Sequence, residues 1–186
     1  MVKFIVTVPH IRCPFGVGKK SHLCDGYSGI AADAMMEVFK EYAPGSVLIE
    51  AQQPRSVVDM NRIQGYDMPE RRALRQIVER RDDDVVVFDV HSFHKEANWP
   101  DKDIVLLDFV PSQQFTKDVI RYFNAQPHGP SMKMLEGTLE NDIIREMAPP
   151  KTLTAVLVEY NEERSVSHTV ETAKLFAIYA VKYFIK

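Results

Sequence analysis

Short runs of β-forming residues alternate along the chain with segments of helical period, and this alternation constrains the fold more than any other feature. The apolar runs cover residues 2 to 9, 46 to 51, 84 to 90, 103 to 110 and 153 to 158. Three of them are almost continuously apolar, as strands covered on both faces should be. The pattern predicts a three-layer α/β/α fold with a mostly parallel, mixed central sheet.

Apolar residues between these runs recur at helical spacing and predict the covering helices. The stripes are Met35, Val38, Phe39 and Tyr42; Ala73, Leu74, Ile77 and Val78; Phe115, Val119 and Tyr122; Met132, Leu135, Leu139 and Ile143; and Val170, Ala173, Ala177, Val181 and Phe184. The fourth stripe contains Gly137, which weakens a helix, and we expect Pro149 and Pro150 to end it. Since no linker divides the chain, we expect a single domain over residues 1–186.

Composition and charge limit the classes of partner. With 45% apolar and 26% charged residues the chain has the make-up of an ordinary globular protein. Its formal charge of −3 gives no reason to expect nucleic acid or an anionic membrane as a partner, and the first apolar run is too short for a membrane helix. Given this charge, we expect a small or peptide-like ligand instead. The two cysteines, Cys13 and Cys24, are too few for a disulfide framework and fit a reducing compartment, so we expect a cytoplasmic protein.

Side chains suited to metal and acid–base chemistry follow the ends of three apolar runs. His10 follows the first, His91 ends the third, and Glu159 directly follows the last. Ligands gather at the carboxyl ends of strands in open α/β sheets. Asp89 shares a pleat side with His91 and is placed to orient its ring. A catalytic zinc takes three protein ligands and needs a nearby carboxylate as base, so we expect a metal site here, with Glu159 either a base or the partner of an arginine.

Other residues are open to two readings. Asn61 and Arg62 offer a fork suited to a substrate carboxylate, although a surface salt bridge would equally occupy Arg62. His94, Trp99 and His128 lie in loops that would line a pocket. Two histidines and two cysteines could instead close one structural zinc site, which would make the chain a metal-stabilised binding module. Its members would be His10, Cys13, His22 and Cys24.

Taken together in chain order, these short motifs resemble the signature of the N-formylglutamate amidohydrolase family, which belongs with the zinc carboxypeptidases and aspartoacylases. The motifs are Val8-Pro9-His10, Asp25, Asp59-Met60-Asn61-Arg62, Asp89-Val90-His91-Ser92 and Val158-Glu159-Tyr160-Asn161. The resemblance spans residues 8 to about 162 and rests on the order of the motifs and their placement at strand ends.

This resemblance implies a metal-dependent amidohydrolase that binds one zinc ion through His10 and His91 and uses Glu159 as general base. Asn61 and Arg62 would grip a substrate carboxylate. In the carboxypeptidase relatives an acidic ligand lies three positions after the first histidine, where this chain has Cys13. The amidohydrolase branch carries an aspartate in about the region of Asp25, so the resemblance implies Asp25 as the third ligand, with Cys13 as the alternative.

The implied substrate is an N-acyl amino acid or a short peptide with a free carboxylate. N-formyl, N-acetyl and peptide substrates all meet that description. A relative that keeps the fold and binds a metal or a carboxylate without catalysis is the alternative.

Overall fold

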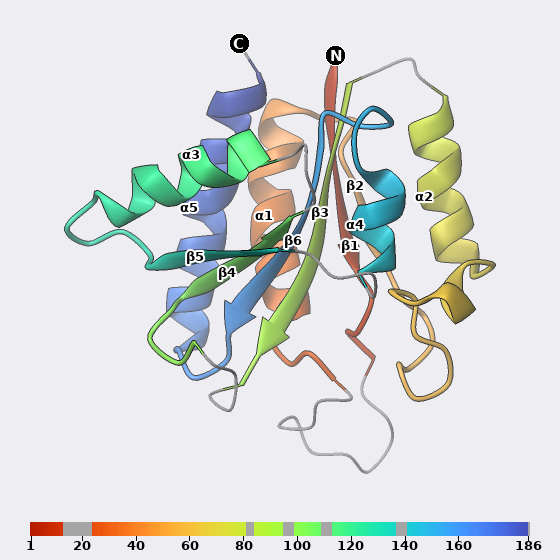
Figure 1. Cartoon of the computed structure of the whole chain (residues 1–186), viewed down its shortest axis with the longest axis horizontal. Helices are drawn as coiled ribbons and strands as arrows, with labels where there is room; N and C mark the ends of the chain where they lie inside the picture. The colour runs from red at the N-terminus through yellow and green to blue at the C-terminus, as the bar shows by residue number, and fades with distance from the viewer. Residues whose placement is uncertain (13–23, 81–83, 95–98, 109–112, 137–140, 186) are drawn as a thin grey trace.

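A computed structural model describes residues 1–12, 24–80, 84–94, 99–108, 113–136 and 141–185, built around one six-stranded sheet (Figure 1). The strand order is β2-β1-β3-β6-β4-β5. The strands are β1 (Val2–Val8), β2 (Val47–Glu50), β3 (Asp84–Phe93), β4 (Ile104–Asp108), β5 (Met132–Glu136) and β6 (Thr154–Asn161). Four strands run parallel, while β4 pairs antiparallel with β6 and parallel with β5. The predicted mixed, mostly parallel α/β fold is confirmed.

Helices cover both faces of this sheet (Figure 1). They are α1 (Ser28–Tyr42), α2 (Pro69–Glu79), α3 (Gln113–Asn124), α4 (Asp142–Met147) and α5 (Val166–Phe184), with a 3-10 turn η1 (Ile63–Gly65) before α2. The helices α1, α3 and α5 lie on one face, and α2 and α4 on the other. Within the described ranges, every helix is too short or too polar to cross a bilayer.

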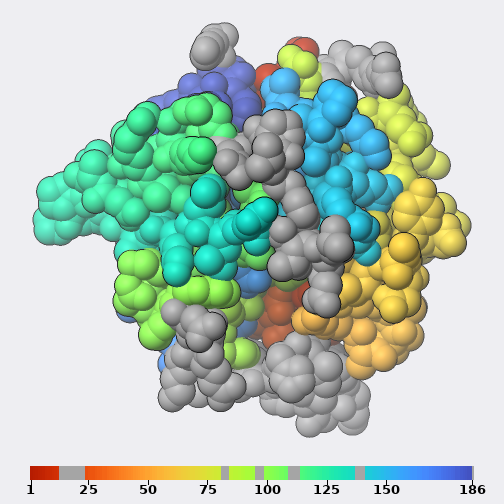
Figure 2. Space-filling view, in the orientation of Figure 1, coloured from red at the N-terminus to blue at the C-terminus, as the bar shows by residue number. Residues whose placement is uncertain are grey.

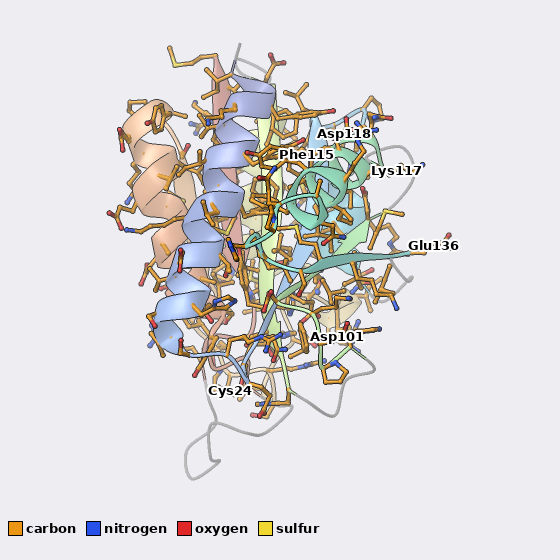
Figure 3. All side chains as sticks on the ribbon, turned by 90° about the vertical axis from the view of Figure 1, so that its left-hand side faces the viewer. Cys24, Asp101, Phe115, Lys117, Asp118 and Glu136 are labelled. Atoms are coloured by element: carbon orange, nitrogen blue, oxygen red, sulfur yellow. The ribbon has the colours of Figure 1, made fainter. Side chains whose placement is uncertain are left out.

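Alternation along the strands divides the apolar side chains between two cores. Phe4 and Phe88 face α1 and α5, while their neighbours Ile5 and Val87 face α2 and α4. The ring centroids of Phe4 and Phe39 lie 4.2 Å apart, and those of Phe88 and Phe176 lie 5.2 Å apart. Phe115, labelled in Figure 3, brings α3 against Phe176 of α5. These aromatic contacts hold α1 and α5 against the strands that carry the polar ends.

The helix predicted from Met132, Leu135, Leu139 and Ile143 is wrong. Met132 and Leu135 belong to β5, which pairs with β4 and places them opposite Ile104 and Leu107. A separate short helix, α4, follows the intervening glycine and contains Ile143. Backbone hydrogen bonds to a neighbouring strand thus outweigh a helical spacing that rested on four residues. Leu139 lies outside the described residues, and α4 ends before Pro149 as expected.

The carboxyl ends of β1, β3 and β6 meet at one edge of the sheet, and both chain termini lie at the opposite end of the molecule (Figure 1). These three adjacent parallel strands carry three of the polar residues that the sequence singles out. The fold therefore brings side chains that are far apart in the sequence into a single neighbourhood.

Candidate metal centre

Three buried groups converge at this edge. His10 follows β1, His91 lies near the end of β3, and Asp25 precedes α1. One ligand atom from each lies within 4.8 Å of the other two. Oδ2 of Asp25 is 3.2 Å from Nδ1 of His10 and 2.9 Å from Nδ1 of His91. Two imidazole nitrogens and a carboxylate oxygen form the donor set that a catalytic zinc takes, so the residues fit such an ion.

The loop that carries Asp25 is joined to the end of β1 by its backbone. The amide of Asp25 donates a hydrogen bond of 3.2 Å to the carbonyl of His10. The hydroxyl of Ser28, in the first turn of α1, donates to the carbonyl of Asp25 over 2.8 Å. These bonds bring the acidic ligand beside the first histidine although fourteen residues separate them in the chain.

Each histidine has its second ring nitrogen held by another aspartate. Nε2 of His10 lies 2.8 Å from Oδ1 of Asp59, and Nε2 of His91 lies 3.2 Å from Oδ2 of Asp89. Thr7 donates to Asp89 over 2.5 Å and fixes that carboxylate in turn. A carboxylate on one ring nitrogen keeps the proton there and leaves the other nitrogen for a metal. The expected contact of Asp89 with the ring of His91 is confirmed, whereas the contact of Asp59 with His10 was not predicted.

Charge in the cluster favours a cation. Burial would raise the pKa of Asp25, but hydrogen bonds from His10 and His91 outweigh it and hold that pKa well below its ordinary value. Burial would lower the pKa of His91, but the charges of Asp89 and Asp25 raise it well above its ordinary value. The pKa of Asp59 falls to about 2, since its bond with His10 outweighs burial. Ionised aspartates around two imidazoles attract positive charge, whether protons or a metal ion supply it.

Glu159 lies beside this cluster. It pairs in register with His91 across β3 and β6, so the two side chains leave the same face of the sheet. It is half-buried, and burial raises its pKa to about 7 against the opposing charge of His91. Among the described residues, no side chain forms a hydrogen bond or ion pair with Glu159. A carboxyl group with a pKa near neutrality and no structural partner has the properties of a general base.

A cavity of about 310 Å³ opens over these groups and is lined by His10, Asp25, His91 and Glu159. In Figure 2, atoms coloured for the start of the chain lie recessed between the β4–β5 region and the segment that follows β2. Arg55 and Arg62 line the same cavity, and their Nε atoms lie 3.0 Å and 3.6 Å from Oδ2 of Asp59. One wall of the cavity is thus cationic, and it includes Arg55, which no motif in the sequence indicates.

Asn61 lies behind His91. Its Nδ2 is 3.3 Å from Nε2 of His91, and its Oδ1 accepts a hydrogen bond of 3.2 Å from the amide of Ile143 in α4. The residue is only 3% exposed. Its carbonyl oxygen therefore fixes Asn61 to α4, and its NH2 group lies beside the ring of His91.

The remaining predicted residues are dispersed. His94 lines the cavity, whereas Trp99 packs on Phe93 with ring centroids 5.9 Å apart. His128 is exposed in the turn between α3 and β5.

A larger cavity of about 620 Å³, near Arg75 and Lys151, lies where β3 and β6 begin. It is remote from the histidines, so size alone does not locate the site.

Cys24 is disulfide-bonded and lies at the end of the molecule where α1 and α5 begin (Figure 3). It has no thiolate to offer, which removes one ligand from the alternative zinc site made of two histidines and two cysteines. The other members unique to that alternative, Cys13 and His22, lie outside the described residues. A disulfide also weakens the argument from cysteine usage for a reducing compartment.

Solved structures share this fold, although the sequence matches no protein-family model and no curated protein. The gene product Atu2144 from Agrobacterium tumefaciens is similar with a TM-score of 0.68 and 16% identity, covering 97% of this chain and 86% of that one. An N-formylglutamate amidohydrolase from Ralstonia eutropha is similar with a TM-score of 0.66 and 14% identity, covering 97% and 93%. The catalytic domain of CwlV, an N-acetylmuramoyl-L-alanine amidase from Bacillus (Paenibacillus) polymyxa var. colistinus, gives 0.57 and 11%, covering 98% of both chains. At these identities the likeness establishes the fold alone.

The raised pKa of Glu159 makes the stability of the metal-free protein depend on pH. Between its ordinary value of 4.5 and about 7, the folded protein keeps a proton that the unfolded chain releases. The free energy of unfolding therefore falls as pH rises through this window. Glu159→Gln removes the titrating group, so relative to the native chain it should gain about 1–3 kcal/mol on going from pH 5 to pH 8. Urea unfolding in the presence of a chelator measures the difference.

Glu163→Gln is the matched control, because Glu163 is exposed and close in sequence. Its stability relative to the native chain should change little between the two pH values. An equally flat result for Glu159→Gln would show that the carboxyl group of Glu159 titrates as it does in water.

Proposed function

We propose that this chain is a metal-dependent hydrolase that cleaves an amide bond in a small molecule carrying a free carboxylate, such as an N-acyl amino acid or a short peptide. The observation that carries the proposal is the convergence of His10, Asp25 and His91 within 4.8 Å, with Glu159 in register beside His91. Among the described residues, the carboxyl group of Glu159 has no hydrogen-bond or ion-pair partner. The shared fold of an amidohydrolase and an amidase supports hydrolysis of an amide.

One zinc ion is the proposed cofactor, held by Nδ1 of His10, Nδ1 of His91 and Oδ2 of Asp25. Asp59 and Asp89 keep the Nε2 protons in place and so present both Nδ1 atoms as lone pairs. When bound, the metal would supply Lewis-acid polarisation of the amide carbonyl and would make a water molecule more acidic.

Glu159 is the proposed general base. Its pKa of about 7 lets it accept a proton from the attacking water near neutral pH and return that proton to the departing amine nitrogen. It lies beside His91 and lines the cavity, so a scissile bond bound in the cavity next to the metal would be within its reach. The side chain is only half-buried, which keeps it within reach of a bound substrate.

The cationic wall is the proposed contact for the substrate carboxylate. Arg62 and Arg55 share Asp59 through their Nε atoms, which fixes the two guanidinium groups at one side of the cavity. Guanidinium groups pair with carboxylates in a planar, directional manner. Asn61 is the proposed second contact: its Oδ1 accepts from α4, while its NH2 group cannot donate to Nε2 of His91 when that nitrogen carries the proton shared with Asp89, and the residue lines the cavity.

Metal binding is the first test of this function. The native chain, freed of metal and then offered zinc, should bind one ion, and His91→Ala should lose that ion because one of three protein ligands is gone. His128→Ala is the control, since this histidine is exposed and outside the cavity lining. Metal analysis after gel filtration measures the ratio. A native chain that stays metal-free would favour a carboxylate-binding relative without catalysis.

Kinetic measurements should then distinguish the proposed role of Glu159 in catalysis from that of Arg62 in substrate binding. With N-formyl and N-acetyl amino acids as substrates, Glu159→Gln should keep its zinc, and its kcat should fall about 10²–10⁴-fold, because the base is gone while the ligands remain.

Arg62→Ala should raise KM for the free acid but leave KM unchanged for the matching substrate with a carboxamide in place of the carboxylate. Steady-state kinetics on both substrates provide the comparison, and equal effects on acid and carboxamide would remove Arg62 from carboxylate recognition.

A further inference from the structure

A second carboxylate, Glu162, lies close to the metal cluster without belonging to it. It follows the end of β6, and only 7% of its side chain is exposed. Oε1 accepts hydrogen bonds from the amide of Gly26, over 2.6 Å, and from the hydroxyl of Ser92. Oε2 lies 3.1 Å from Nδ1 of His94. Burying a carboxylate is costly unless donors surround it, and here three donors do so, one from the turn before α1 and two from the end of β3.

The hydrogen bonds from Gly26 and Ser92 connect Glu162 to the turn that carries Asp25. Gly26 directly follows Asp25, the acidic member of the cluster. The hydroxyl oxygen of Ser92 also accepts a hydrogen bond of 3.2 Å from the amide of Tyr27. Two successive amides after Asp25 are therefore held by Glu162, one directly and one through Ser92. The turn that presents Asp25 is fixed to β3 and β6, the strands that carry His91 and Glu159.

The residues at the start of helix α1 provide no side-chain cap that could hold this turn in place. Its N-cap residue, Tyr27, makes no side-chain hydrogen bond to the helix, and the first turn contains no acidic residue. Free amides at the start of a helix need acceptors and attract negative charge. Glu162, which precedes α5, brings a negative charge close to the start of α1 and accepts from the amide of Gly26, the residue before the N-cap. Figure 3 shows the starts of α1 and α5 at the same end of the molecule.

Position 26 is adapted to this contact. A Cβ atom added to Gly26 would lie 3.3 Å from Oε2 of Glu162 and 3.4 Å from Oε1. Such a Cβ would force the carboxylate to shift, so glycine allows it to come within 2.6 Å of the amide nitrogen. The remaining donor, His94, lines the cavity and is 21% exposed, and Glu162 fixes the orientation of its ring.

We propose that Glu162 is a positioning residue of the metal centre: it holds the Asp25 turn in register with His91 and Glu159 and orients His94 at the cavity wall. This inference rests on the proposed metal-dependent function. Glu162 neither binds the metal nor touches the reacting atoms, and it acts through the backbone of residues 26 and 27. Removing such an outer partner commonly weakens metal binding by about 10–100-fold.

Zinc affinity measured by competition with a chelator tests this role. Glu162→Ala should bind zinc about 10–100-fold more weakly than the native chain. Glu162→Gln should stay near native affinity, because its side-chain oxygen can accept from Gly26 and Ser92 as the carboxylate does. Glu163→Ala, an exposed neighbouring glutamate, should leave affinity unchanged. Hydrogen exchange of the metal-free proteins should show faster exchange at the amides of Gly26 and Tyr27 in Glu162→Ala, with the strands still protected.

Ser92→Ala gives a second test if Glu162→Ala fails to fold. It removes one donor to Glu162 and the acceptor for Tyr27, so it should weaken zinc binding and speed exchange at Tyr27. Native zinc affinity in Glu162→Ala, or in Ser92→Ala if only that variant folds, would overturn the positioning role and leave the proposed function intact. A native chain that binds no zinc would overturn both, so the two failures are distinguishable.

Discussion

The parallel pairing of β3 between β1 and β6 is the constraint on which the site depends. Register places His91 directly beside Glu159, and the same register brings the end of β1, with His10 just beyond it, to the same edge. A shift of one residue in either pairing would turn one of these side chains to the opposite face. The aromatic contacts of Phe4 and Phe88 with α1 and α5 hold the register, because they lock alternate residues of the strands into the core.

At this end of the sheet the chain brings several buried or half-buried carboxyl groups together. Three aspartates contact the two histidines, and Glu159 stands beside them, while Arg55 and Arg62 lie at the cavity wall near one aspartate. Buried carboxylates are stable only with partners of opposite charge or with hydrogen-bond donors. The same need explains why His91 holds its proton strongly, why a divalent ion suits the cluster, and why the nearby carboxylate of Glu162 is surrounded by donors.

Much of this arrangement is visible in the sequence, and the rest depends on contacts that leave no local pattern. Buried strands appear in the sequence as apolar runs, so the sequence predicts β1, β3 and β6. It also predicts the polar residues at their ends, which are His10, His91 and Glu159. The strand β5 could not, because Met132 and Leu135 also fit a helical stripe until pairing with β4 decides between the two. The roles of Asp59 and Glu162 arise from contacts between segments that are distant in the chain, with His10 and with Gly26 respectively. No periodicity records such approaches, and only the short motif around Asp59 gave a hint.

X-ray absorption at the zinc edge of the zinc-loaded protein examines the claim on which the rest stands, namely that His10, His91 and Asp25 hold the metal. We expect a first shell of nitrogen and oxygen alone, at about 2.0–2.2 Å, with the outer-shell signal of two imidazole rings. In His10→Ala the imidazole signal should fall to that of one ring. Sulfur at about 2.3 Å, or a first shell without imidazole, would contradict the assignment and place the metal elsewhere in the chain.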